Sequence, residues 1–168
     1  MRQCTLLAIL VLVLTPVTSE GQVRLIVGGG LSQPNGDFTN QVNTGLHGRA
    51  GLQVGVPVFP VSLRGEGEIH QFSKPTGAEN TTMLNGTLSA VLGLGGIGLQ
   101  PYLLAGIGSY RLDAGGTEGA QTNRGFHGGF GVGIGALGFG GFAEIRLVSI
   151  SGDTGNTRYI PVTLGLRV

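Results

Sequence analysis

The chain of 168 residues contains 34 glycines, no tryptophan and only 11% charged residues, and its formal net charge is +1. This length suits one domain. The near-neutral charge, without a Lys/Arg cluster, gives no reason to expect a nucleic-acid partner, so we expect none. The lack of a Gly-X-Y repeat excludes collagen, and the mean hydropathy of +0.28 excludes a flexible Gly-rich linker.

The first predicted element is an export signal. Arg2 supplies a positive charge ahead of the apolar run Leu6–Leu14, and small residues follow up to Ser19. We therefore expect a signal peptide over residues 1–19 and a mature domain over residues 20–168. Cleavage after Gly21 and a buried helix are the alternatives. Cleavage removes Cys4, and an exported chain without cysteine indicates a bacterial envelope protein.

Apolar and polar residues alternate along the rest of the chain, which predicts β-strands with one apolar face. Eight strands are expected, at 22–31, 44–56, 61–72, 85–94, 102–112, 126–136, 141–149 and 159–168. Long polar connections (32–43, 73–84, 113–125 and 150–158) alternate with short ones (57–60, 95–101 and 137–140). This pattern predicts an all-β fold, an eight-stranded antiparallel up-and-down transmembrane β-barrel with the long loops at one end.

The faces of the strands decide what surrounds the barrel. In a soluble barrel the apolar face would point inward, and the charges would form a solvated outer face. The apolar set is mostly Leu, Val, Ala and Gly, which favours lipid contact. We therefore expect Leu46 to Val56 to face lipid on alternate residues, and a polar network to fill the lumen. Its members are Arg49, Arg64, Glu66, Glu68, Glu144, Arg146 and Arg167.

The fifth strand allows both orientations. Tyr102 and Tyr110 alternate with Leu103, Ala105 and Ile107. Because tyrosines anchor membrane proteins at the interface, we predict that these two face outward and that Arg111 faces inward.

Three segments carry a family resemblance: 52–72 (LQVGVPVFPVSLRGEGEIHQF), 101–112 (PYLLAGIGSYRL) and 158–168 (RYIPVTLGLRV). Together they resemble the bacterial outer-membrane β-barrel domain family, the OmpA-like and OmpX-like barrels, over essentially the whole mature chain. The resemblance implies the outer membrane of Gram-negative bacteria, contact with outer-membrane lipid, and recognition by the barrel-assembly machinery. This family usually ends in an aromatic residue, and Val168 departs from that pattern.

Possible inward-facing histidines are His47, His70 and His127, which we expect near the long-loop end. They could bind a transition metal together or form hydrogen bonds inside the barrel. We favour hydrogen bonds and expect no metal and no cofactor. The glycine motif at 93–98 leads into a strand, so it predicts a turn and no nucleotide site.

Three function classes remain open. The first is an integral outer-membrane barrel with a structural or surface-loop interaction role and a plugged polar lumen. The second is a small-solute channel. The third is a rim enzyme, for which Ser73, His70 and Asp113 are candidates without a motif, so we expect no enzyme. The sequence names no surface ligand.

Overall fold

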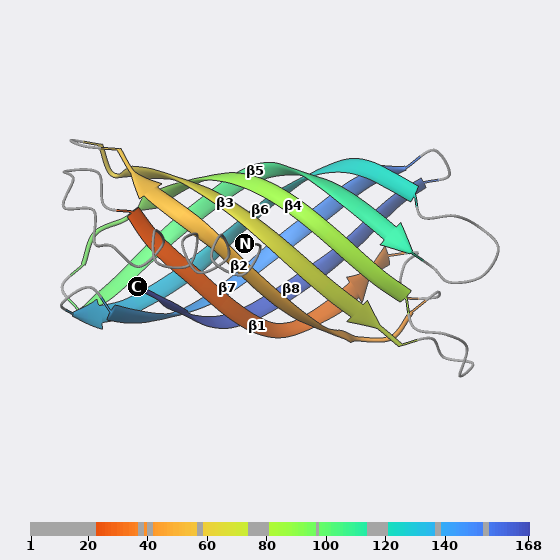
Figure 1. Cartoon of the computed structure of the whole chain (residues 1–168), viewed down its shortest axis with the longest axis horizontal. Helices are drawn as coiled ribbons and strands as arrows, with labels where there is room; N and C mark the ends of the chain where they lie inside the picture. Colours follow the sequence, from red (N-terminus) through yellow and green to blue (C-terminus); the bar gives the residue numbers. More distant parts are fainter. Residues whose placement is uncertain are drawn as a thin grey trace, which may run out of the picture.

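The computed structural model describes residues 23–36, 39, 42–56, 59–73, 81–96, 98–113, 121–136, 139–152 and 155–168. They form a closed barrel of eight strands in sequence order (Figure 1). The predicted signal peptide, residues 1–19, lies outside the described residues. No helix in this part of the chain is long and apolar enough to cross a membrane. The strands are β1 (Val23–Asn35), β2 (Gly45–Gly55), β3 (Val61–Phe72), β4 (Thr81–Gly93), β5 (Leu99–Asp113), β6 (Gln121–Ala136), β7 (Phe139–Gly152) and β8 (Gly155–Arg167).

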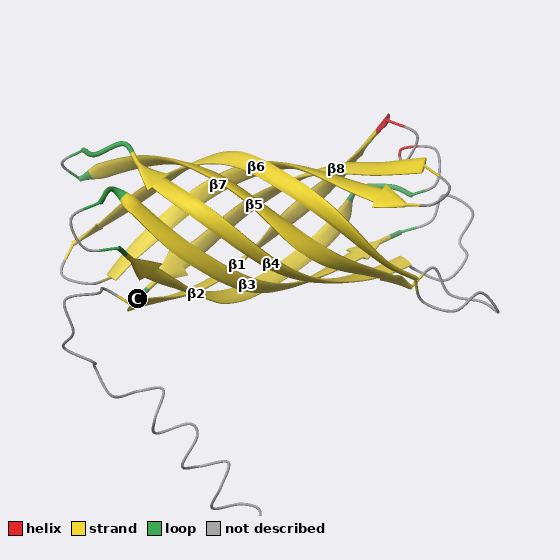
Figure 2. Ribbon diagram, turned by 90° about the horizontal axis from the view of Figure 1, so that it is seen from above, coloured by secondary structure: helices red, strands yellow, loops and turns green. Residues whose placement is uncertain are grey.

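Neighbouring strands pair antiparallel, and β1 closes the barrel against β8 through pairs such as Gly28 with Gly165. Closure leaves no sheet edge, so the backbone groups of the strands hydrogen-bond to each other as a membrane interior requires. The β2–β3, β4–β5 and β6–β7 connections share one end of the barrel with the start of β1 and the end of β8. We call this the short-turn end, marked by the C-terminus in Figures 1 and 2, and the opposite one the loop end.

Side chains alternate between the two faces as expected for a barrel in lipid. On β2, Leu46 is 67% exposed on the outside, whereas the next residue, His47, is 7% exposed on the inside. The large exposed hydrophobic side chains, such as Leu88, Ile107 and Leu164, form an apolar outer surface. Such a surface is stable against hydrocarbon and not against water. The predicted eight-stranded transmembrane barrel is thus confirmed.

The strands extend further toward the loop end than the sequence pattern predicted. β1 continues to Asn35, β4 begins at Thr81, and β6 begins at Gln121. The prediction of a long connection over 150–158 is wrong, because β7 reaches Gly152 and β8 starts at Gly155. Ladder hydrogen bonds join backbones and do not require apolar side chains. The strands therefore continue beyond the apolar belt, where alternation stops giving a signal.

The predicted orientation of the fifth strand is also wrong. Tyr102 and Tyr110 face the interior, at 4% and 2% exposure, and Arg111 is exposed on the outside. The reason is space inside the barrel. Gly131 lies where the Tyr102 ring packs, and a Cβ at Gly125 would lie 3.0 Å from the Tyr110 ring. Inward glycines on β6 thus accommodate both rings.

This use of glycine recurs around the lumen. A Cβ at Gly51 would lie 2.7 Å from Cγ of Glu66, and a Cβ at Gly106 would lie 2.8 Å from the His127 ring. A Cβ at Gly129 would lie 3.0 Å from Cγ of Arg146. An eight-stranded barrel encloses little more than packing space. Large inward side chains therefore lie over glycines of neighbouring strands.

The interior is layered along the barrel axis. An apolar and aromatic cluster fills it toward the loop end and contains Val42, Phe72, Met83, Tyr110, Val148, Ile150 and Tyr159. A smaller cluster of Val91, Tyr102 and Leu104 lies toward the short-turn end. Buried charged residues of β2, β3 and β7 occupy the space between these clusters.

Candidate functional site

The most distinctive feature of the interior is a cluster of buried charges, which we call the charge cluster. It contains three arginines and three glutamates, each at most 5% exposed: Arg49, Arg64, Glu66, Glu68, Glu144 and Arg146. They come from β2, β3 and β7, and β3 and β7 lie at opposite positions in the ring of strands. Alternation directs all six inward, so the equal numbers of positive and negative charges meet inside the barrel.

Arg146 connects the two walls. Its Nε donates to Glu144 Oε1 at 2.5 Å, its Nη1 donates to Glu68 Oε1 at 2.8 Å, and its Nη2 donates to Glu66. Arg146 thus binds both glutamates of β3 from the opposite wall. Breaking a buried pair by removing one partner typically costs about 3–5 kcal/mol, because a buried charge remains without compensation.

The other two arginines also bind Glu144, Arg49 at the oxygen that Arg146 contacts and Arg64 at the other oxygen. Arg49 Nη1 lies 2.8 Å from Glu144 Oε1, and Arg64 Nη1 lies 2.7 Å from Glu144 Oε2. The Tyr102 hydroxyl donates to the same Oε2 at 2.7 Å. Arg49 Nη2 has no hydrogen-bond partner in the described structure, and the guanidinium lies over the Phe142 ring at 5.3 Å. Most donors and acceptors of the cluster are therefore used within it.

Two of the three histidines meet near the loop end. His47 and His70 are paired across β2 and β3, and their ring centroids are 5.0 Å apart. Ser32 Oγ lies 3.0 Å from His47 Nδ1 and 2.8 Å from His70 Nδ1. Because a hydroxyl has one proton, it can donate to one Nδ1 and must accept from the other. His70 Nε2 lies 3.2 Å from Glu68, which joins the pair to the charge cluster.

His127 lies apart from this pair. It is buried on β6, with Nε2 2.8 Å from Ser89 Oγ and Nδ1 3.5 Å from the Tyr110 hydroxyl. The structure therefore brings two of the predicted histidines together and leaves the third among other partners. Within the described ranges, no group of three or more His, Cys, Asp or Glu side chains could hold a metal ion.

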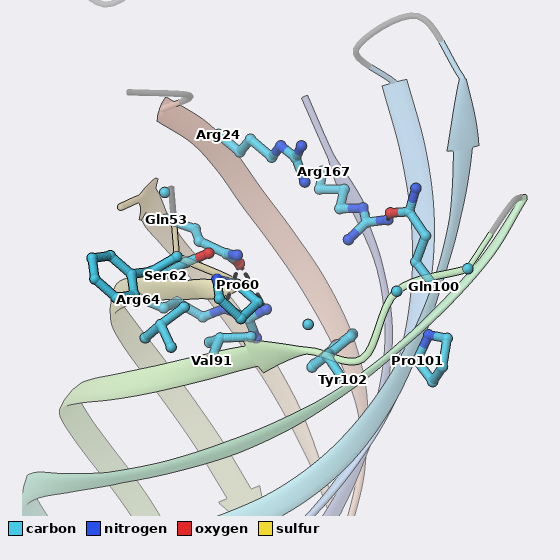
Figure 3. A pocket seen from close by; sticks show the side chains of 16 residues that line it. Arg24, Gln53, Pro60, Ser62, Arg64, Val91, Gln100, Pro101, Tyr102 and Arg167 are labelled. Carbon is cyan, nitrogen blue, oxygen red and sulfur yellow. Dashed lines mark hydrogen bonds between the residues drawn. The ribbon is translucent and has the colours of Figure 1, made fainter. Parts of the chain in front are cut away.

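Arg167, which we predicted in the polar network of the lumen, lies outside the charge cluster. It lies near the short-turn end, where its Nη2 donates to Gln100 Oε1 at 2.5 Å. A cavity of about 360 Å³ opens beside it (Figure 3). We call it the mouth cavity. Its lining includes Arg24, Gln53, Arg64, Gln100, Tyr102 and Arg167.

Sequence reasoning missed several interior partners. Ser32 fell in a predicted loop, and no local signal marks it as a histidine partner. Tyr102 was predicted to face outward. Thr163 does alternate with outward residues of β8, so its contact with His47 Nε2 at 2.8 Å lies on a face that the pattern identifies as inward. The odd or even position of a residue along its strand (its parity) predicts which face it lies on, but not which residue it contacts across the barrel.

Comparison with known proteins agrees with this geometry. The sequence profile described as "Outer membrane protein beta-barrel domain" matches residues 4–167. Among curated protein sequences, none matches the chain.

Three solved structures share the fold. Neisserial surface protein A (NspA) superposes with a TM-score of 0.72 at 16% identity, covering 89% of this chain and 97% of that one. The N-terminal β-barrel domain of Pseudomonas aeruginosa OprF gives a TM-score of 0.54 at 17% identity, with coverages of 88% and 99%. Yersinia pestis Ail gives 0.51 at 12% identity, with coverages of 88% and 99%.

Proposed function

The chain belongs to the outer membrane protein beta-barrel domain family, and we propose that this bacterial outer-membrane protein is a structural barrel that presents loops and conducts no solute. The observation that carries the proposal is the connection made by Arg146. Its guanidinium binds Glu144 on its own strand and Glu66 and Glu68 on the opposite wall. A solute moving along the axis would have to separate these buried pairs.

The packing above and below the charge cluster supports a closed lumen. Phe72 and Tyr159 pack edge to face with ring centroids 6.0 Å apart, and both are fully buried toward the loop end. Val91, Tyr102 and Leu104 fill the interior toward the short-turn end. With eight strands, such side chains are enough to fill the cross-section.

A small-solute channel is the second candidate, because the lumen is charged. Planar-bilayer recording of the refolded protein separates the two. The structural proposal expects no stable conductance steps from the wild-type barrel. The matched variants are Glu66→Ala, inside the charge cluster, and Arg124→Ala, on the exposed outer face. Wild-type steps that Glu66→Ala alters and Arg124→Ala does not would favour transport.

A rim enzyme is the third candidate, and one series of side-chain contacts resembles a catalytic arrangement. Ser32 Oγ, His70 and Glu68 follow each other at 2.8 and 3.2 Å, the order of a nucleophile, a base and an orienting acid. However, Ser32 and His70 are both 0% exposed, so no substrate reaches the hydroxyl. We therefore assign this chain of contacts to packing and hydrogen bonding. An ester-hydrolysis activity lost in His70→Ala, with the barrel still folded, would overturn this assignment.

The expected partners of the barrel follow from its location in the outer membrane. Outer-membrane lipid surrounds the apolar face. We infer that the barrel-assembly machinery inserts the chain and that the loop-end connections contact a surface ligand.

A further inference from the structure

We propose that the mouth cavity at the short-turn end binds a phosphate-type oxyanion. This assignment goes beyond a structural role, because it gives the barrel a ligand at the end opposite the loops. It rests on the charge of the lining, the direction of its hydrogen bonds and the way in which Arg167 is held.

The lining is positively charged. Arg24, Arg64 and Arg167 contribute guanidinium groups, and none of the described residues that line the cavity carries a carboxylate. Arg64 is bound to Glu144 of the charge cluster at its inner side. Arg24 and Arg167 lie at the mouth itself.

The register explains why these side chains gather. Arg24 pairs with Gln53 across β1 and β2, and Gln53 pairs with Arg64 across β2 and β3. On the other side, Arg167 of β8 pairs with Ile26, two residues from Arg24. Arg24 and Arg167 are therefore diagonal neighbours on adjacent strands, and Gln53 of β2 lies between Arg24 and Arg64. Figure 3 shows Arg167 between Arg24 and Gln100.

The two amide side chains of the lining, Gln53 and Gln100, accept from arginines through their oxygens. Gln53 Oε1 accepts from Arg64 Nε at 3.0 Å and from Nη2 at 2.8 Å. Gln100 Oε1 likewise accepts from Arg167 Nη2. Because a guanidinium group can only donate, it fixes which amide atom faces it and leaves the NH₂ group as the outer one. Guanidinium and amide donors around one cavity match the oxygens of an anion.

Arg167 is held in place by glycines. Its side chain passes Gly140 on β7, where a Cβ would lie 3.1 Å from its Nε, and reaches Gly133 on β6, where a Cβ would overlap the guanidinium. It ends at Gln100 on β5. The two glycines open a path across two strands, so the guanidinium is oriented before any ligand arrives.

Size and charge favour phosphate over a carboxylate. The volume of about 360 Å³ is roughly twelve times the ~30 Å³ share of one liquid water, which leaves room for a tetrahedral oxyanion and its hydration. A phosphate group presents three or more oxygens, whereas a carboxylate presents two. Donors from β1, β2, β3, β5 and β8 approach from several sides. Free phosphate and a phospholipid headgroup at the rim share this chemistry.

The test is isothermal titration calorimetry. Inorganic phosphate is titrated into the refolded full-length mature protein in a nonionic detergent, and the heat of binding is measured. We expect saturable binding that Arg167→Gln weakens about tenfold, because it removes charge-assisted hydrogen bonds. Gly133→Ala, which displaces the guanidinium and keeps its charge, should weaken binding in the same direction. Arg124→Gln makes the same charge change on the outer face and should leave the affinity unaltered. Heat-modifiable gel migration verifies that each variant is folded.

Absence of saturable binding by the wild type would overturn the proposal. So would equal losses in Arg124→Gln and Arg167→Gln, because binding would then follow overall charge. If Arg167→Gln does not fold, Gly133→Ala decides the matter alone. Adding phosphatidylglycerol to the micelles identifies the source: competition with phosphate supports a lipid headgroup, and unchanged affinity supports free phosphate as the ligand.

Discussion

At the scale of single residues, the interior depends on Arg146. Its three carboxylate partners lie on two walls, and its side chain is 2% exposed. Such a residue cannot be replaced by a hydrophobic one without leaving an excess of negative charge among the remaining partners. Glu66 and Glu68 depend on it most, because Glu144 is also bound by Arg49 at 2.8 Å and by Arg64 at 2.7 Å.

Arg146→Met should lower the free energy of unfolding by about 3–5 kcal/mol, because Glu66, Glu68 and Glu144 lose their common partner. Urea unfolding in micelles, followed by the gel shift between folded and unfolded forms, measures the change. Arg124→Met serves as the exposed control and should differ little from the wild type. Equal midpoints for the two variants would contradict the assigned role of Arg146.

Two glycines, one facing the lumen and one facing lipid, should respond differently to replacement by alanine. Gly51 faces the lumen, where a Cβ would lie 2.7 Å from Glu66 Cγ, and Gly65 faces lipid with nothing within 4 Å of a Cβ. Gly51→Ala should destabilise the barrel by about 1–3 kcal/mol through overpacking. Gly65→Ala should be neutral or stabilising by up to about 1 kcal/mol, because it restricts the unfolded chain. The same urea assay tests both, and a reversed order would contradict the inward packing of Gly51.

At the scale of elements, alternation predicted the membrane part of the strands correctly. It identified β2 and β3 almost to the residue, because inward polar residues alternate with outward apolar residues or glycines over most of their length. It could not predict where strands continue beyond the apolar belt, as at Gly152 and Gly155. It also could not orient β5, since tyrosine and leucine are both compatible with lipid. The space left by Gly131 decides that case, and only the register reveals it.

Alternation is also insufficient to predict contacts between side chains inside the barrel. The seven predicted lumen residues were chosen by parity, yet parity alone does not distinguish Arg167 from the six residues that form ion pairs. That distinction depends on height along the barrel axis, which strand tilt and register set. The contact of Ser32 with both His47 and His70 depends on the closing partner β1 in the same way.

The extension of β6 and β8 leads to a prediction from hydrogen exchange. Backbone amides in Gln121–Arg124 and in Asn156–Arg158 should exchange much more slowly than in an unfolded chain, because ladder pairs such as Arg124 with Ser151 include them. Amide exchange of the protein in micelles, followed by NMR, measures this. Gly129, in the middle of β6, is the protected reference. Fast exchange of the amides in these two segments would contradict the longer strands and support the shorter strand bounds predicted from the sequence.

At the scale of the whole molecule, the barrel has two different ends. Both the start of β1 and the end of β8 lie at the short-turn end (Figure 2). In an outer-membrane barrel this end faces the periplasm, and the loop end faces the outside. The orientation in the membrane can therefore be tested with one residue.

Lys74 is the only lysine in the sequence, two residues beyond the end of β3 at Phe72. An amine reagent too large for porins should label Lys74 on intact cells, because that connection belongs to the loop end. Peptide mass spectrometry locates the label, and Lys74→Arg removes it. Labelling that requires permeabilised cells would mean that the barrel is inserted in the opposite direction.

The ion pairs between β7 and β3 also affect how the barrel assembles. Arg146 meets Glu66 and Glu68 only when strands far apart in the sequence stand opposite each other in a closed ring. An open sheet inserted in the bilayer would leave these charges facing hydrocarbon without their partners, at high cost. Partly closed intermediates are therefore disfavoured relative to the complete barrel. The charge cluster makes barrel formation cooperative, so that the protein folds as one unit or not at all.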